Sequence, residues 1–121
     1  MQPVLVIEDD EDTATALLEL LRLEQIPAVG ARNGAAAIDR FQEGVRPCVI
    51  VLDLAMPVLS GEQFLKDRRL APELARVPVL IITGRDVTPD DFPGMNVAAV
   101  FRKPFDPWQI VEAVKPYIDG S

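Results

Sequence analysis

Short apolar runs alternate with amphipathic stretches along the whole chain, and this alternation limits the folds that the chain can adopt. Three of the runs are almost continuously apolar, which is typical of strands covered on both faces of a sheet. Strands of this kind, joined by helices, form an open and mostly parallel sheet with right-handed crossovers. We therefore predict an α/β fold with strands at residues 3–7, 28–31, 48–52, 79–83 and 97–101.

The stretches between the strands have helical periodicity and recognisable end signals. Asp12 is a candidate N-cap of the first helix. The second helix is expected over residues 35–43, with Gly44 as its C′ glycine. Ser60 begins an S-x-x-Q capping box for the third helix.

The last two helical stretches carry prolines that limit them. Thr88 begins a helix well, but the Phe-Pro-Gly sequence at 92–94 is expected to stop it after a turn or two. The final helix is expected to have Asp106 as N-cap and Pro107 at its first position. Pro116 should end or kink that helix in its last turn.

The composition is that of one globular domain, which we expect to span residues 1–121. No apolar run approaches the roughly 20 residues of a membrane span. The amino terminus has no signal-peptide pattern, so we expect a cytoplasmic protein without a membrane partner. The net charge of −7 argues against direct binding of nucleic acid, because that requires a positive surface.

The chain contains no histidine, which excludes histidine-based acid–base catalysis and histidine-ligated zinc. Its chemistry must rely on carboxylates, hydroxyls, lysine or arginine. Such groups follow the predicted strands at the carboxyl edge, where ligands bind in open α/β sheets. They are the acidic run at 8–12, Asp53, Thr83 and Lys103.

Carboxylates gathered at one sheet edge need a counter-charge. Two of them about 4 Å apart repel by roughly 4 kcal/mol at an effective dielectric constant of about 20. A hard divalent cation with oxygen ligands and retained waters, Mg²⁺ above all, removes this repulsion, and Lys103 adds a further positive charge. The alternative for residues 8–12 is a solvated acidic turn that caps the first helix. Asp53, Thr83 and Lys103 at matching strand ends favour the metal site.

Asp53 follows the strand at 48–52 and could simply end it. A carboxylate fixed on a strand end beside a metal and a lysine is also a usable nucleophile toward phosphorus. Phosphoryl transfer needs alignment and charge neutralisation more than a proton-shuttling histidine. The Thr83 hydroxyl could donate a hydrogen bond to a transferred oxygen, and Lys103 could neutralise its charge.

Four stretches in order resemble the receiver domain of bacterial two-component response regulators, over essentially the whole chain. They read VLVIEDD at 4–10, VLDLAMPVLSG at 51–61, PVLIITG at 78–84 and RKPF at 102–105. The resemblance implies the flavodoxin-like doubly wound (βα)5 fold, with a parallel sheet of order 2-1-3-4-5.

The resemblance also implies roles for single residues. Asp53 would be the phosphoacceptor, and Glu8 and Asp9 the metal-binding pair; Asp10 comes one position too late. The main-chain carbonyl of Ala55 would be a further metal ligand beside the Asp53 carboxylate. Thr83 would be the switch hydroxyl and Lys103 the phosphate-contacting lysine, with a cis Lys103–Pro104 bond.

A receiver of this kind is a phosphoacceptor signalling domain and not an enzyme, beyond self-phosphorylation from small donors and autodephosphorylation. It would take its phosphoryl group from a sensor histidine kinase or a histidine phosphotransfer protein and switch the binding of an output partner. This chain departs from the family pattern at Val100, where an aromatic residue is usual. Phe101 is adjacent, but on a strand it points to the opposite face.

Other functions on related folds fit less well. An FMN site needs a hydroxyl- and glycine-rich phosphate loop where residues 8–12 are acidic, and a dinucleotide site needs G-x-G-x-x-G, which is absent. A phosphatase of the haloacid dehalogenase type would need an acid at position 55, which is Ala55. A receiver-like interaction module that signals without phosphate stays open because of Val100.

Overall fold

The computed structural model describes residues 2–55, 61–67 and 72–118. Its strands form one parallel sheet of order β2-β1-β3-β4-β5, which confirms the predicted fold class. The predicted strand positions are confirmed with shifts of at most one residue at an end. The strands are β1 (Val4–Ile7), β2 (Ala28–Ala31), β3 (Val49–Asp53), β4 (Val79–Thr83) and β5 (Val97–Arg102).

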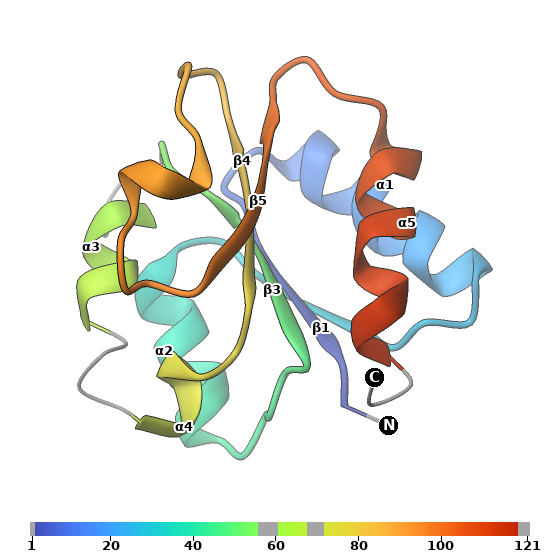
Figure 1. The fold of residues 1–121 in the computed structure, drawn as a ribbon. Helices are drawn as coiled ribbons and strands as arrows, with labels where there is room; N and C mark the ends of the chain where they lie inside the picture. Colours follow the sequence, from blue (N-terminus) through green and yellow to red (C-terminus); the bar gives the residue numbers. More distant parts are fainter. Residues whose placement is uncertain (1, 56–60, 68–71, 119–121) are drawn as a thin grey trace.

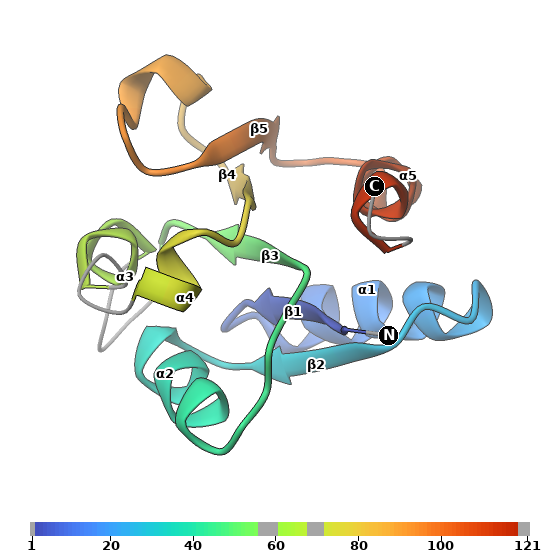
Figure 2. The ribbon, with the colours of Figure 1, turned by 60° about the horizontal axis from the view of Figure 1, so that its bottom comes forward.

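Helices cover both faces of the sheet (Figures 1 and 2). One layer consists of α1 (Glu11–Leu23) and α5 (Pro107–Ile118). The opposite layer contains α2 (Gly34–Gln42), α3 (Gly61–Asp67), α4 (Pro72–Ala75) and the short 3₁₀ helix η2 (Pro89–Asp91). In the described part of the chain, no helix has both the length and the apolar character needed to cross a membrane.

The alternation of side chains along each strand divides the core into two clusters, one on each face. Leu5 and Ile7 of β1 belong to the cluster that packs against α2 and α3. Val4 and Val6 belong to the cluster under α1 and α5. Each such side chain contributes about 1.5–3 kcal/mol by leaving water. The central strands are therefore rigid supports for the polar residues at their carboxyl ends.

Helix α1 begins two residues earlier than we expected. Its N-cap is Asp10, whose side chain accepts a hydrogen bond from the Thr13 N–H at 3.2 Å. The prediction of Asp12 as N-cap is wrong, because β1 ends at Ile7 and leaves only a short connection before the helix. Asp12 instead lies in the first turn of α1, where a carboxylate interacts favourably with the helix dipole.

The end of α2 matches the sequence prediction. Gly44 has a φ of 106°, and its N–H donates to the Phe41 carbonyl at 3.1 Å. The next N–H, of Val45, donates to the Arg40 carbonyl at 3.0 Å, which completes a Schellman motif. A glycine is favoured here because a left-handed conformation is strained for other residues.

The connections on either side of β4 differ from regular strand–helix units. The residues between β3 and β4 include both α3 and α4 where a single helix was predicted, and Ser60 lies outside the described residues. Between β4 and β5 the helix is reduced to η2, as the Phe-Pro-Gly sequence at 92–94 predicted.

Helix α5 begins at Pro107 as expected but continues past Pro116 to Ile118, because a proline in the last turn removes only one helical hydrogen bond.

Candidate functional site at the carboxyl edge of the sheet

The sheet order brings the predicted site residues to one edge. Asp53 is the last residue of β3, which lies between β1 and β4. Glu8 directly follows β1, and Thr83 is the last residue of β4. The chain order reverses between β1 and β3, which is the position where open α/β sheets bind their ligands.

Three carboxylates form a cluster at this edge. Ligand oxygens of Glu8, Asp9 and Asp53 all lie within 4.8 Å of one another. The Glu8 and Asp53 residues are each only 2% exposed, whereas Asp9 is exposed. The cluster therefore has two buried carboxylates and one carboxylate that is open to solvent.

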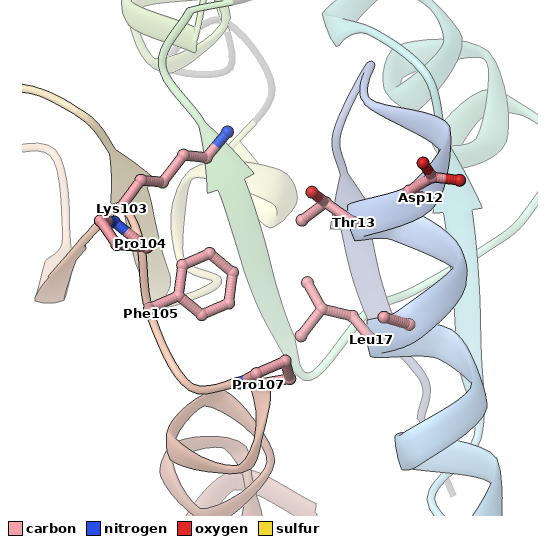
Figure 3. A pocket seen from close by; sticks show the side chains of 8 residues that line it. Asp12, Thr13, Leu17, Lys103, Pro104, Phe105 and Pro107 are labelled. Atoms are coloured by element: carbon pink, nitrogen blue, oxygen red, sulfur yellow. The ribbon is translucent and has the colours of Figure 1, made fainter.

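Lys103 joins the two buried carboxylates. Its Nζ donates to Glu8 Oε1 at 3.1 Å and to Asp53 Oδ2 at 3.4 Å. Figure 3 shows the side chain extending from the connection after β5 toward the end of β3. The Lys103–Pro104 peptide bond is cis, as predicted. The pairing of Lys103 with Glu8 could not be read from the sequence, because it depends on which carboxylate is buried.

Burial changes the proton affinity of this cluster. It is the main cause that raises the pKa of Glu8 to about 8, and a hydrogen bond with Asp53 adds to the effect. Lys103 acts in the opposite direction but does not cancel the shift. For Lys103, burial lowers the pKa, but the Glu8 hydrogen bond and the Asp53 charge outweigh burial and leave the pKa above its usual value.

Thr83 links the site to two connections. Its side chain is buried, and its hydroxyl oxygen accepts a hydrogen bond from the Arg85 N–H at 3.1 Å. Its main-chain carbonyl accepts from the Lys103 N–H at 2.7 Å. Because the oxygen acts as acceptor toward Arg85, its hydrogen remains able to donate to another group.

The backbone after Asp53 is held by the carboxylate itself. Asp53 Oδ1 accepts a hydrogen bond from the Ala55 N–H at 3.1 Å. Ala55 is exposed and lies immediately after Leu54, next to the cluster. Its predicted role, as a main-chain metal ligand, stays a prediction.

The donor set suits a hard divalent cation. Carboxylate oxygens are the ligands that Mg²⁺ prefers, and a partly open site leaves room for the waters that it keeps. Glu8, Asp9 and Asp53 could together hold the ion, which would offset the repulsion among their charges. The residues present therefore fit the predicted metal.

An apolar cavity of about 570 Å³ lies beside Lys103, between α1 and the connection from β5 to α5 (Figure 3). Leu17 and Phe105 face each other across it. This cavity could not be predicted from the sequence, because its lining comes from α1, from the connection after β5 and from the start of α5.

The two residues at the centre of β5 point to opposite faces, as predicted. Val100 packs against the core cluster that lies under α2 and α3. Phe101 packs against the cluster under α1 and α5. No aromatic ring of β5 therefore lies on the face where the family usually has one.

The sequence matches the response regulator receiver domain family over residues 4–115. The chain belongs to this family. It is therefore a receiver domain of two-component signal transduction, which agrees with the sheet order and with the acidic cluster at its carboxyl edge.

Individual relatives agree with this assignment. The transcriptional regulatory protein CpxR homolog of Haemophilus influenzae is 30% identical over 123 residues, which cover all of this chain and 52% of the relative. The chain thus spans about half the length of this relative, as it does for several other curated regulators.

Solved structures confirm the fold. The receiver domain of the Francisella response regulator 1452 has a TM-score of 0.84 and 25% identity, with 99% of this chain and 98% of that one covered. The Mn²⁺-bound form of response regulator Rcp1 has a TM-score of 0.79 and 23% identity, with 100% and 97% covered.

Proposed function

We propose that the chain accepts a phosphoryl group on Asp53 in a Mg²⁺-dependent reaction and thereby switches the binding of an output partner. The observation that carries this proposal is the position of the Asp53 carboxylate. It belongs to a cluster with Glu8 and Asp9 whose ligand oxygens lie within 4.8 Å, and it lies 3.4 Å from Lys103 Nζ. The proposed nucleophile, the candidate metal ligands and the Lys103 ammonium group are thus close together.

In the proposed reaction, an Asp53 carboxylate oxygen attacks the phosphorus of a phosphohistidine. The phosphorus–nitrogen bond breaks, the imidazole nitrogen keeps the electron pair and takes up a proton, and Asp53 becomes an acyl phosphate. Lys103 stabilises the negative charge of the transferred oxygens, and Thr83 donates a hydrogen bond to one of them. A bound Mg²⁺ would supply further neutralisation of that charge.

The phosphoryl donor must be another molecule or another domain, because the chain contains no histidine. We infer that it is a sensor histidine kinase or a histidine phosphotransfer protein in the cytoplasm. The apolar cavity supports this inference, since it offers a largely apolar contact surface beside Lys103, whose Nζ lies 3.4 Å from the Asp53 carboxylate.

Incubation with acetyl phosphate and Mg²⁺, followed by intact-mass measurement, tests the proposal. The expected product carries one phosphoryl group, which is lost at alkaline pH and does not form in EDTA. The matched control is Asp53→Asn, which keeps the size of the side chain but removes the nucleophile. An adduct that persists in Asp53→Asn would contradict the assignment.

A receiver-like module that signals without phosphate is the alternative, and Val100 is the observation that favours it. That face of β5 has Val100 and no aromatic ring, so a movement of Thr83 could not be passed on by the rotation of an aromatic side chain there. The absence of any adduct in the wild-type protein, combined with partner binding that is insensitive to Asp53→Asn, would support this module.

A further inference from the structure

Gly61, the first residue of α3, lies against the main chain that follows the phosphoacceptor. Its N–H donates to the Leu54 carbonyl at 3.0 Å. A Cβ atom at position 61 would come within 2.6 Å of both the Asp53 carbonyl oxygen and the Leu54 Cα. Real Cβ atoms essentially never come so close, so a side chain here must displace backbone.

The requirement for glycine is one of space and not of backbone conformation. Gly61 does not have the left-handed φ that Gly44 and Gly94 have at 106° and 72°. The obstructing atoms belong to the peptide group between Asp53 and Leu54, so they cannot turn away as the end of a side chain could. Gly30 is different, because an added Cβ there would meet only the Leu18 Cδ1 at 3.1 Å.

Displacement of this peptide group would act directly on the site. The Asp53 carboxylate is attached to the residue whose carbonyl is pushed, and it also holds the Ala55 N–H at 3.1 Å. The Asp53 carboxylate must also keep its position relative to Glu8 and Lys103. Those two residues are held separately, by β1 and by the connection after β5, and would not move with it. A shift of one member would open the cluster.

We propose that Gly61 is a positioning residue for Asp53: its missing side chain lets α3 begin directly against the Asp53–Leu54 peptide and so fixes the phosphoacceptor within the metal-binding cluster. The inference deepens the proposed function and rests on it for its biological meaning. A substitution at position 61 is therefore expected to weaken metal binding by more than its cost in stability explains. Groups that orient metal ligands typically contribute about 10–100-fold in affinity.

The test compares Gly61→Ala with two control variants. Gly30→Ala adds the same methyl group at a site where the end of the Leu18 side chain, and not backbone, would have to give way. Val114→Ala removes buried volume from α5, in the core cluster on the face away from α3, and supplies a protein that is destabilised without a direct effect on Asp53. For each variant, thermal unfolding gives the stability, and electron paramagnetic resonance of free Mn²⁺ gives the metal affinity without any phosphodonor.

Amide chemical shifts of the metal-free variants add a readout that does not depend on the ion. We expect Gly61→Ala to shift the amides of Asp53, Leu54 and Ala55 and to weaken Mn²⁺ binding by about tenfold or more. Gly30→Ala and Val114→Ala are expected to bind Mn²⁺ as the wild type does. Trimethylamine N-oxide, which favours the folded state, is added to all samples if Gly61→Ala needs it to fold.

Three results would overturn the inference. They are wild-type Mn²⁺ affinity in Gly61→Ala, an equal loss of affinity in Val114→Ala, and failure of Gly61→Ala to fold even with the osmolyte, which would make its role purely structural. Because these readouts use no phosphoryl donor, they are separate from a failure of Asp53 phosphorylation itself.

Discussion

Glu8 is the residue of the proposed metal site whose protonation state matters most. The residue is buried beside Asp53, and both carboxylates share the one ammonium group of Lys103. Burial favours the protonated form of Glu8, whereas metal ligation requires the ionised form. In the proposed metal site, protons and the divalent ion would therefore compete for this side chain.

This competition predicts a pH dependence of stability. The pKa of Glu8 is raised from its ordinary value of 4.5 to about 8 in the folded protein. Between pH 4.5 and pH 8, the folded state therefore holds a proton on Glu8 that the unfolded state has released. The free energy of unfolding of the metal-free protein should thus fall as the pH rises between these two values. Thermal unfolding in EDTA measures the decline, and Mg²⁺ should oppose it more strongly at the higher pH.

Glu8→Gln is the control, since it keeps the side-chain size and does not titrate. Its unfolding midpoint in EDTA should depend less on pH over the same range. Equal pH profiles for the variant and the wild type would show that Glu8 is not the titrating group.

For single residues, the sequence predicted that four site residues lie together, because each follows a strand and parallel strands end at one edge of the sheet. These residues are Glu8, Asp9, Asp53 and Lys103. The sequence did not predict contacts that depend on side-chain burial or local spacing. Asp10 and Asp12 are equally good caps by type, and only the position where β1 ends decides between them. The need for Gly61 was also hidden, because it arises from contact with the Asp53–Leu54 peptide.

At the level of single elements, the N-terminus of α2 is stabilised by one capping side chain. Asn33 is its N-cap, and its Oδ1 accepts a hydrogen bond from the Ala36 N–H at 2.8 Å. Asn33→Ala should lower the free energy of unfolding by about 1 kcal/mol, because the N–H loses its partner. Urea denaturation measures this, with Asn33→Asp as a capping-competent control that should stay close to the wild type.

β5 is the element in which the sequence pattern was most informative. The Phe-Pro-Gly sequence at 92–94 predicted the short connection, and the alternation of strand residues placed Val100 and Phe101 on opposite faces. The pattern did not reveal the irregularity of β5, in which the pairing passes from Val79–Val97 to Leu80–Ala99 and leaves Ala98 out. A bulge of this kind protects an edge strand from pairing with other chains.

In the whole molecule, Thr83 and Lys103 connect the acidic cluster to the β5 side of the sheet. Lys103 follows β5 and donates its N–H to the Thr83 carbonyl, and the Thr83 hydroxyl accepts from Arg85. If Thr83 turns to donate to a phosphoryl oxygen, the Arg85 hydrogen bond is weakened. The connection toward η2 should therefore respond to the state of Asp53.

Amide chemical shifts with and without a beryllofluoride phosphate mimic measure this response. We expect changes at Asp53 that extend through Thr83 and Arg85 to β5 and α5. Thr83→Ala should confine the changes to the surroundings of Asp53. Changes limited to that region in the wild type would contradict the coupling and favour the phosphate-independent module.

The central claim, that Asp53 takes the phosphoryl group, is tested most directly by chemical trapping. Borohydride reduces an aspartyl phosphate to homoserine, which peptide sequencing by mass spectrometry then locates. After treatment with acetyl phosphate and Mg²⁺, we predict homoserine at position 53 and unmodified aspartate at positions 9 and 10. Homoserine at another position, with position 53 unchanged, would contradict the account.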